Sequence, residues 1–189
     1  EDVERFVRIS EKDKGIIGDF VWTGMDHIGE VGLGAFEYRD YAPTYIHSLG
    51  WLTSGCGRVD VTGKPLAEAY YVKAAYGMLE KPVVAVKPVN HNGERHSPSG
   101  WKFTEAVESW AWTGCEGKVA RVEAYGCGDK IELWLNGRRV GKKSLKKSCR
   151  AKFRIRYRSG ELTAKVISGG KVVSESTLKS EIGRASCRE

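Results

Sequence analysis

Hydrophobic and polar residues follow a helical period near the start of the chain. Residues 2–14 place three apolar side chains on one helical face among acidic and basic neighbours, and Gly15 follows as a stop. This pattern predicts an amphipathic helix. A second helix is predicted between Pro65, which suits a first helical turn, and Gly77, which suits a C-terminal cap.

Between these helices lies the short apolar sequence GIIGDFVW, residues 15–22. It is too short for a helix and too continuously apolar for a half-exposed strand, so it predicts a strand buried on both faces, as in a parallel sheet. The following residues 29–57 are rich in glycine and aromatic residues and predict a long loop, which in a compact domain is usually functional or packed on itself. Helix, buried strand, loop and helix together predict part of an α/β fold.

The period changes to two in the second half of the chain. Alternation is clear in KVARVEAY, KIELWLNGRRVGK, AKFRIRYRSGEL and LTAKVISGGKVV. The pairs Asn136-Gly137 and Gly169-Gly170 are hairpin-turn signals. Short strands at this spacing predict an antiparallel sandwich of the immunoglobulin-like class. We expect an α/β unit at 1–80, a linker at 81–90, where prolines occur without helical period, and the sandwich at 91–180.

Charge is divided unevenly between the two units. Of the net +7, residues 1–87 contribute −3 and residues 88–180 contribute +10. Eleven lysines and arginines and no acid lie between Arg138 and Arg158. One hypothesis is binding of nucleic acid or another anionic polymer. The favoured interpretation is a solvated sheet face, since Arg154 and Arg156 alternate with apolar residues and no RNA-binding signature accompanies them.

Cofactor and metal chemistry find little support in the sequence. The four histidines lack metal-ligand spacing, and no phosphate-binding or dinucleotide-binding motif occurs, so no cofactor is expected. The five cysteines are scattered without a CxxC pair, which favours free thiols and leans toward a reducing, cytoplasmic compartment. No apolar stretch approaches the ~20 residues of a membrane span, so no membrane partner is expected.

Tryptophans offer the most informative single positions. Trp110 and Trp112 would share a face on a strand, which favours a sandwich core or an interdomain contact over a sugar-binding platform. Trp22 stands at the C-terminal end of the predicted buried strand. In a parallel barrel that end opens onto the active-site face, where an aromatic ring can stack on a sugar. From composition alone, a core position for Trp22 is the favoured alternative.

Residues 16–30, 54–77 and 109–143 carry three motifs, and together these motifs resemble glycoside hydrolase family 2, the family of β-galactosidases, β-glucuronidases and β-mannosidases. IIGDFVWTGMDHIGE resembles its last barrel strand and following loop, and SGCGRVDVTGKPLAEAYYVKAAYG resembles its closing segment. SWAWTGCEGKVARVEAYGCGDKIELWLNGRRVGKK is similar to the immunoglobulin-like domain that follows the barrel in β-galactosidase-type members. The resemblance implies that residues 1–80 are the end of a TIM barrel, followed by an all-β sandwich.

The same resemblance implies a retaining hydrolase in which one carboxyl protonates the leaving oxygen and a second attacks the anomeric carbon. Both family glutamates would precede this chain, so we expect no catalytic residue here and no activity from the chain alone. Trp22 matches the tryptophan that floors the sugar subsite. Asp26 falls in the same loop and is expected to support that floor or contact sugar.

The implied partner is a carbohydrate substrate, and nucleic acid and membrane are not expected. Leu52-Thr53-Ser54 occupies the place of the Asn-x-Lys of β-glucuronidases, so a neutral β-galactoside is favoured. The resemblance leaves open whether the parent protein is a homo-oligomer. The alternatives are a carbohydrate-binding or adhesive module that uses the aromatics of residues 36–51, and a basic nucleic-acid-binding sandwich. Residues 181–189 have no period and little apolar content, and we expect them to be non-native.

Overall fold

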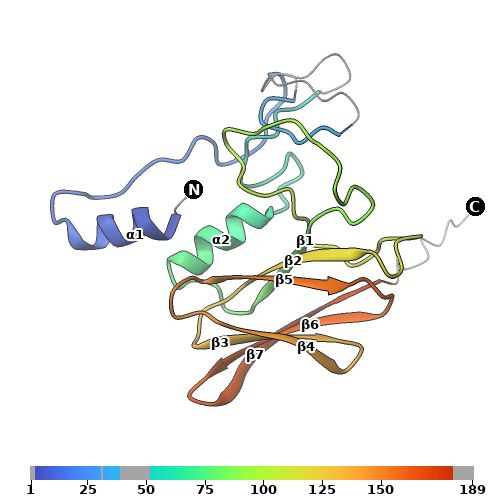
Figure 1. Cartoon of the computed structure of the whole chain (residues 1–189). Helices are drawn as coiled ribbons and strands as arrows, with labels where there is room; N and C mark the ends of the chain where they lie inside the picture. Colours follow the sequence, from blue (N-terminus) through green and yellow to red (C-terminus); the bar gives the residue numbers. More distant parts are fainter. Residues whose placement is uncertain (1–2, 31, 39–51, 181–189) are drawn as a thin grey trace, which may run out of the picture.

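The computed structural model describes residues 3–30, 32–38 and 52–180. The tail at 181–189 and most of the aromatic loop, with Tyr41, Tyr45 and Trp51, lie outside the described residues. Two helices precede a sandwich of two sheets (Figure 1). The elements are α1 (Val3–Lys12), α2 (Ala67–Ala75), β1 (Val83–Val86), β2 (Val119–Tyr125), β3 (Lys130–Leu135), β4 (Arg138–Ser144), β5 (Arg150–Arg156), β6 (Glu161–Ser168) and β7 (Lys171–Lys179).

Both sheets are antiparallel throughout. One has the order β1-β2-β5 and the other the order β4-β3-β6-β7. The predicted turns are formed: Asn136 and Gly137 have φ values of 50° and 76° between β3 and β4, and Gly169 and Gly170 have 56° and 81° between β6 and β7. Positive φ at both central residues gives a turn whose twist matches the flanking strands. The β sandwich predicted from alternation is confirmed.

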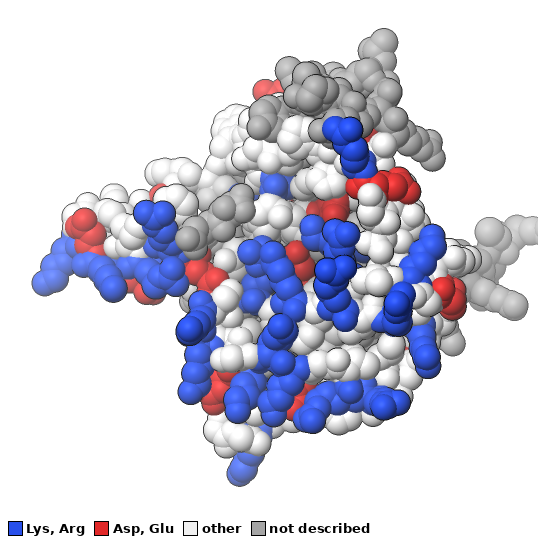
Figure 2. Space-filling model, viewed as in Figure 1, with Lys and Arg blue, Asp and Glu red and all other residues white. Residues whose placement is uncertain are grey.

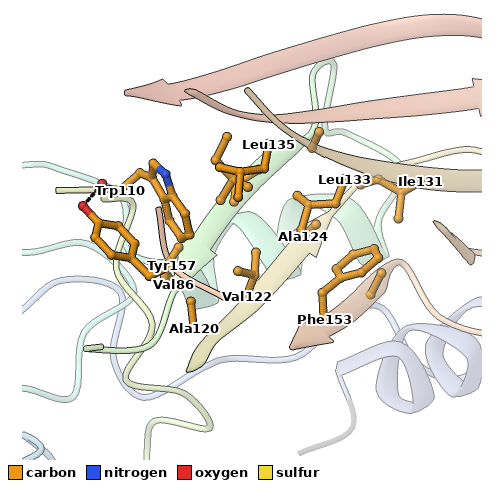
Figure 3. Packing of buried hydrophobic residues seen from close by; sticks show 14 of the residues in the cluster. Val86, Trp110, Ala120, Val122, Ala124, Ile131, Leu133, Leu135, Phe153 and Tyr157 are labelled. Carbon is orange, nitrogen blue, oxygen red and sulfur yellow. Dashed lines mark hydrogen bonds between the residues drawn. The ribbon is translucent and has the colours of Figure 1, made fainter. Parts of the chain in front are cut away.

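The sandwich core lies between the two sheets (Figure 3). Alternate residues of β2, β3 and β5 point inward, and Lys152, Arg154 and Arg156 of β5 are exposed. At one end the indole of Trp110 is fully buried and packs edge-on against Tyr157, with ring centroids 4.8 Å apart. Trp112 packs against the same cluster. The core role predicted for this tryptophan pair is therefore confirmed, although neither residue lies in a strand as expected.

A smaller apolar cluster joins the first unit to the sandwich. Tyr71 and Ala74 of α2 pack on Ala85 and Tyr125, which face outward from the three-stranded sheet. Helix α2 thus covers one end of that sheet's outer face (Figure 1). The guanidinium of Arg150 lies over the rings of Tyr71 and Phe103, 4.7 and 4.9 Å from their centroids.

The linker predicted at 81–90 needs correction. Residues 83–86 form β1, and the side chains of Val84 and Val86 are buried in the sandwich core. Pro82 and Pro88 flank this strand and lie outside its hydrogen-bonded ladder, so they bound the strand where the sequence interpretation took them for linker residues.

No helix among residues 3–30, 32–38 and 52–180 is long and apolar enough to cross a membrane. Cys56, Cys115, Cys127 and Cys149 are free thiols, as the scattered spacing predicted.

Candidate functional site

The strand predicted at residues 15–22 is not formed. Residues 16–22 contribute to neither sheet, and their large apolar side chains, among them Ile17, Phe20 and Trp22, are exposed. A strand requires hydrogen-bonding neighbours on its edges, and none of the described residues supplies them here. Residues 16–22 are mostly apolar as the sequence shows, but no described segment packs on them to bury their side chains.

Trp22 lies at the edge of an apolar cavity of about 450 Å³ between α1, the 19–22 segment and α2. Its indole is 62% exposed. We call this space the Trp22 cavity; it is lined by Val3, Phe6, Val7, Asp19, Phe20, Val21, Trp22, Arg58, Val72, Tyr76, Gly100, Trp101 and Phe103. A half-exposed aromatic ring beside an apolar hollow is the kind of surface on which a sugar face can stack.

His27 contacts the indole edge, with ring centroids 6.4 Å apart and an interplanar angle of 76°. Its ring is held on both sides, since Nε2 lies 2.8 Å from a carboxylate oxygen of Glu30 and Nδ1 lies 3.2 Å from Oγ of Ser54. Ser54 is buried and also accepts a hydrogen bond from the His27 backbone N–H. The ring that flanks Trp22 is therefore fixed in orientation.

The turn at residues 55–58 ties the Trp22 loop to the rest of the molecule. The backbone N–H of Arg58 donates to the carbonyl oxygens of Thr23 and Gly24, at 3.1 and 3.2 Å. Its guanidinium donates to the carbonyl oxygen of Trp101 at 3.0 Å. Gly57 is required because a Cβ there would lie 2.1 Å from the backbone nitrogen of Asp26.

Asp26 is occupied by this same turn. Its Oδ1 accepts a hydrogen bond of 2.6 Å from the Gly57 N–H, and its own N–H donates to the carbonyl oxygen of Val59 at 2.8 Å. Asp26 lines a separate cavity of about 290 Å³ and is not among the residues of the Trp22 cavity. The structure therefore ties Asp26, four residues after Trp22, to the Gly57 turn but does not bring the two side chains into one cavity.

A polar cluster that the sequence interpretation missed lies where the first unit meets the sandwich. The phenol of Tyr38 donates to the carboxylate of Glu105, which also pairs with Lys87 at 3.3 Å and lies 3.6 Å from His96. The ring of His91 stacks on Tyr38 with centroids 4.1 Å apart. Burial and the neighbouring carboxylate both raise the pKa of Tyr38, so its phenol stays protonated at neutral pH.

Arg58 and Trp101 were also missed as components of the Trp22 cavity. Arg58 lies in the SGCGR sequence that carries the family resemblance, so a signal for it existed. Trp101 comes from a segment without periodicity and gave no such signal. Among the described residues, no group of three or more His, Cys, Asp or Glu side chains could hold a metal ion.

Comparison with known proteins places this geometry in context. A family model described as a domain of unknown function, DUF4982, matches residues 117–174, which lie within the sandwich. No curated protein matches the sequence. Solved structures match almost the whole chain.

A glycosyl hydrolase family 2 member from Bacteroides cellulosilyticus superposes with a TM-score of 0.80 and 26% identity over 95% of this chain. The chain is similar to members of glycoside hydrolase family 2. A second family 2 member, from Bacteroides cellulosilyticus DSM 14838, gives a TM-score of 0.70 and 25% identity over 95% of the chain. A beta-glycosidase from Bacteroides vulgatus shares the fold, with a TM-score of 0.58 and 21% identity over 95%.

This likeness confirms the family resemblance seen in the sequence. The chain spans 24%, 21% and 18% of the lengths of these three proteins. The chain therefore spans less than a quarter of each of these proteins, and the activity of a whole protein is a matter for proposal.

Proposed function

We propose that this chain is part of a retaining β-glycosidase of family 2 that acts on terminal β-galactosides or related neutral β-glycosides. In this proposal residues 1–80 are the end of a TIM barrel, and the sandwich is an immunoglobulin-like accessory domain. The acid and nucleophile glutamates belong to an earlier part of the parent protein, so the chain alone is inactive. The double-displacement mechanism follows from the family's paired carboxyl groups.

One observation carries the proposal: Trp22 is half-exposed beside an apolar cavity, at the end of an apolar segment that pairs with no strand among the described residues. A barrel strand removed from its neighbours would leave such a segment exposed. The ring of Trp22 then forms the floor on which the reacting sugar stacks. The fixed ring of His27 and the Arg58 turn hold that floor in place.

Asp26 has a supporting role in this proposal. Its carboxylate accepts the Gly57 N–H and so fixes the turn that Arg58 uses to hold the Trp22 loop. A substitution at Asp26 is thus expected to act through the position of Trp22. Direct contact of Asp26 with sugar is the weaker of the two roles considered, since its Oδ1 is already engaged.

The experiment joins this chain to the coding sequence that precedes it in the source genome. The longer protein is expected to hydrolyse p-nitrophenyl β-galactoside faster than the β-glucuronide, with retention of anomeric configuration by NMR. Trp22→Ala should lower kcat/KM by about 30-fold, because the stacked ring contributes ~2 kcal/mol. Trp22→Phe should retain part of the activity.

Several results would contradict the proposal. Turnover of the β-galactoside by the 189-residue chain itself would show that the catalytic groups lie within it. An inverted product would exclude the double displacement. A Trp22→Ala variant with unchanged kcat/KM would remove Trp22 from the sugar site.

A further inference from the structure

A hollow of about 570 Å³ opens where the two sheets of the sandwich meet at their edges. Its walls come from the β3–β4 turn, from β4, which is an edge strand of the four-stranded sheet, and from β5, which is an edge strand of the other. The two edges approach closely at Gly141, where a Cβ would lie 2.6 Å from the ring of Phe153. We call this space the arginine hollow; it is lined by Leu135, Asn136, Arg138, Arg139, Val140, Arg154, Ile155, Arg156 and Arg158.

The walls of the hollow contain arginine but no lysine. The basic segment from Arg138 to Arg158 contains six arginines and five lysines. Five of the six arginines line the hollow, and none of the lysines does. A merely solvated face needs only positive charge, which either residue supplies. Arginine differs in presenting a planar fork of donors that binds a carboxylate or a sulfate-like group through two parallel hydrogen bonds.

Acidic groups do little to balance this charge. Arg139 pairs with Glu132 at 3.0 Å, and Arg156 donates to the carbonyl oxygen of Gly117. Within the part of the chain that the structure describes, Arg138, Arg154 and Arg158 form no ion pair. Figure 2 shows lysines and arginines spread over the face of the sandwich in view, with few acids among them.

One arginine of the hollow also lies opposite a like charge on the neighbouring strand of the same sheet. Arg121 of β2 and Arg154 of β5 are register partners in adjacent antiparallel strands. Like charges directly opposite on one sheet face are destabilising. An anionic ligand would offset this repulsion. Arg121 itself lines the separate cavity beside Tyr38 and Glu105, so it adds positive charge next to the hollow without being part of its wall.

We propose that the arginine hollow binds an anionic glycan through its sulfate or carboxylate groups. This inference rests on the proposed function, in which the parent enzyme acts on a carbohydrate; the bound polymer would carry its charges away from the neutral residue that is cleaved. Single-stranded nucleic acid fits poorly, because no aromatic side chain lines the hollow for base stacking. Its volume is that of a typical small-ligand cleft, which suits a sugar unit with one charged substituent.

The test measures binding of the 189-residue chain to dextran sulfate and to polygalacturonate by isothermal titration calorimetry at physiological salt, with uncharged dextran as the control. We expect saturable binding to at least one anionic polymer and none to dextran. Arg154→Lys with Arg158→Lys keeps the net charge and should weaken binding about tenfold, since the bidentate contacts are lost. Lys146→Ala with Lys147→Ala removes two exposed charges outside the hollow and should weaken it less than about twofold.

The two double variants distinguish recognition by the hollow from nonspecific electrostatic attraction to the net positive charge. If the lysine pair weakens binding as much as the arginine pair, the hollow is not the site. Absence of binding to both anionic polymers, or tighter binding of a DNA duplex than of either polymer, would equally overturn the proposal. Circular dichroism of each variant checks that the sandwich is intact.

This assay involves no hydrolysis. Failure of glycan binding leaves the hydrolase proposal standing, and absence of β-galactosidase activity in the longer protein leaves a positive binding result standing.

Discussion

Glu4 accepts a hydrogen bond of 2.8 Å from the backbone N–H of Cys149, 145 positions further along the chain. The second carboxylate oxygen of Glu4 accepts hydrogen bonds from the hydroxyls of Tyr71 and Ser148, both at 2.8 Å. One carboxylate thus links α1 to α2 and to the loop before β5. Among the described residues, Glu4 makes the hydrogen bonds that attach α1 to the sandwich.

The Glu4 contact predicts an acid-labile contribution to stability. Burial acts to raise the pKa of Glu4, but the hydrogen bonds from Cys149, Ser148 and Tyr71 outweigh it and lower the pKa below the usual 4.5. The contribution is therefore complete above pH 4.5 and is lost as pH falls through the lowered folded-state pKa. Glu4→Gln should cost about 1 kcal/mol of unfolding free energy at pH 7 and much less at pH 3, by urea denaturation.

Glu11→Gln is the matched control, because Glu11 is exposed on the same helix. It should leave the unfolding free energy unchanged at both values of pH. An equal loss of stability at pH 7 and pH 3 in Glu4→Gln would contradict the interpretation.

Tyr157 closes the end of the sandwich core through its hydroxyl. This group accepts a hydrogen bond from the Trp112 N–H at 3.1 Å and donates to the carbonyl oxygen of Trp110 at 3.3 Å. Tyr157→Phe leaves both backbone groups without a partner in a buried place and should cost about 1–2 kcal/mol. Tyr70→Phe, which removes an exposed bond to Glu108, should cost less than about 0.5 kcal/mol.

Both tyrosine variants can be followed by tryptophan fluorescence during urea unfolding. Equal effects of the two substitutions would show that the Tyr157 hydroxyl is not a special support of the core.

The turn at Gly57 should be intolerant of any side chain. A Cβ at this position would lie 2.1 Å from the Asp26 nitrogen and 2.5 Å from the carbonyl carbon of Met25. Gly57→Ala should therefore destabilise the first unit by about 2–3 kcal/mol and speed its proteolysis. Gly24→Ala, in the loop that this turn contacts, meets nothing within 4 Å and should resist protease as the unmodified chain does.

Glu68 predicts a pH dependence of the opposite sign to that of Glu4. Its side chain is almost wholly buried, Oε1 has no hydrogen-bond partner, and burial raises the pKa of the carboxyl above 4.5. Stability is thus lost as pH rises from 4.5 through the raised folded-state pKa, because the folded state then holds a buried charge. Glu68→Gln cannot ionise, so its Tm relative to the parent chain should rise between pH 4 and pH 8. A difference in Tm that stays constant with pH would contradict this assignment.

The sandwich could be predicted from the sequence because its signals are local. Alternation marks each strand, and Asn136-Gly137 and Gly169-Gly170 fix the hairpins by needing positive φ. Strand β1 escaped prediction since its four residues are flanked by prolines and carry no alternation. Residues 15–22 show the converse failure: an apolar run indicates what a segment would bury, but burial depends on neighbours that the run itself does not encode.

The candidate site could be predicted only in part, because most of its contacts join residues far apart in the sequence. The family pattern proposed Trp22 as a site residue, which stays a prediction, whereas the contact of Tyr38 with Glu105 joins residues 67 positions apart. Such a pair has no sequence signature, because neither side chain belongs to a motif. The role predicted for Asp26 stays a prediction, and the hydrogen bond from Gly57 that engages its carboxylate depends on tertiary structure.

Strand β1 has a practical consequence for expressing the sandwich by itself. A polypeptide that begins at residue 91 would lack Val84 and Val86 from its core and would leave one edge of β2 without its ladder partner. Bare strand edges of this kind recruit other chains and promote aggregation. The shortest soluble version of the sandwich should therefore start before Pro82, and one started ten residues later should precipitate.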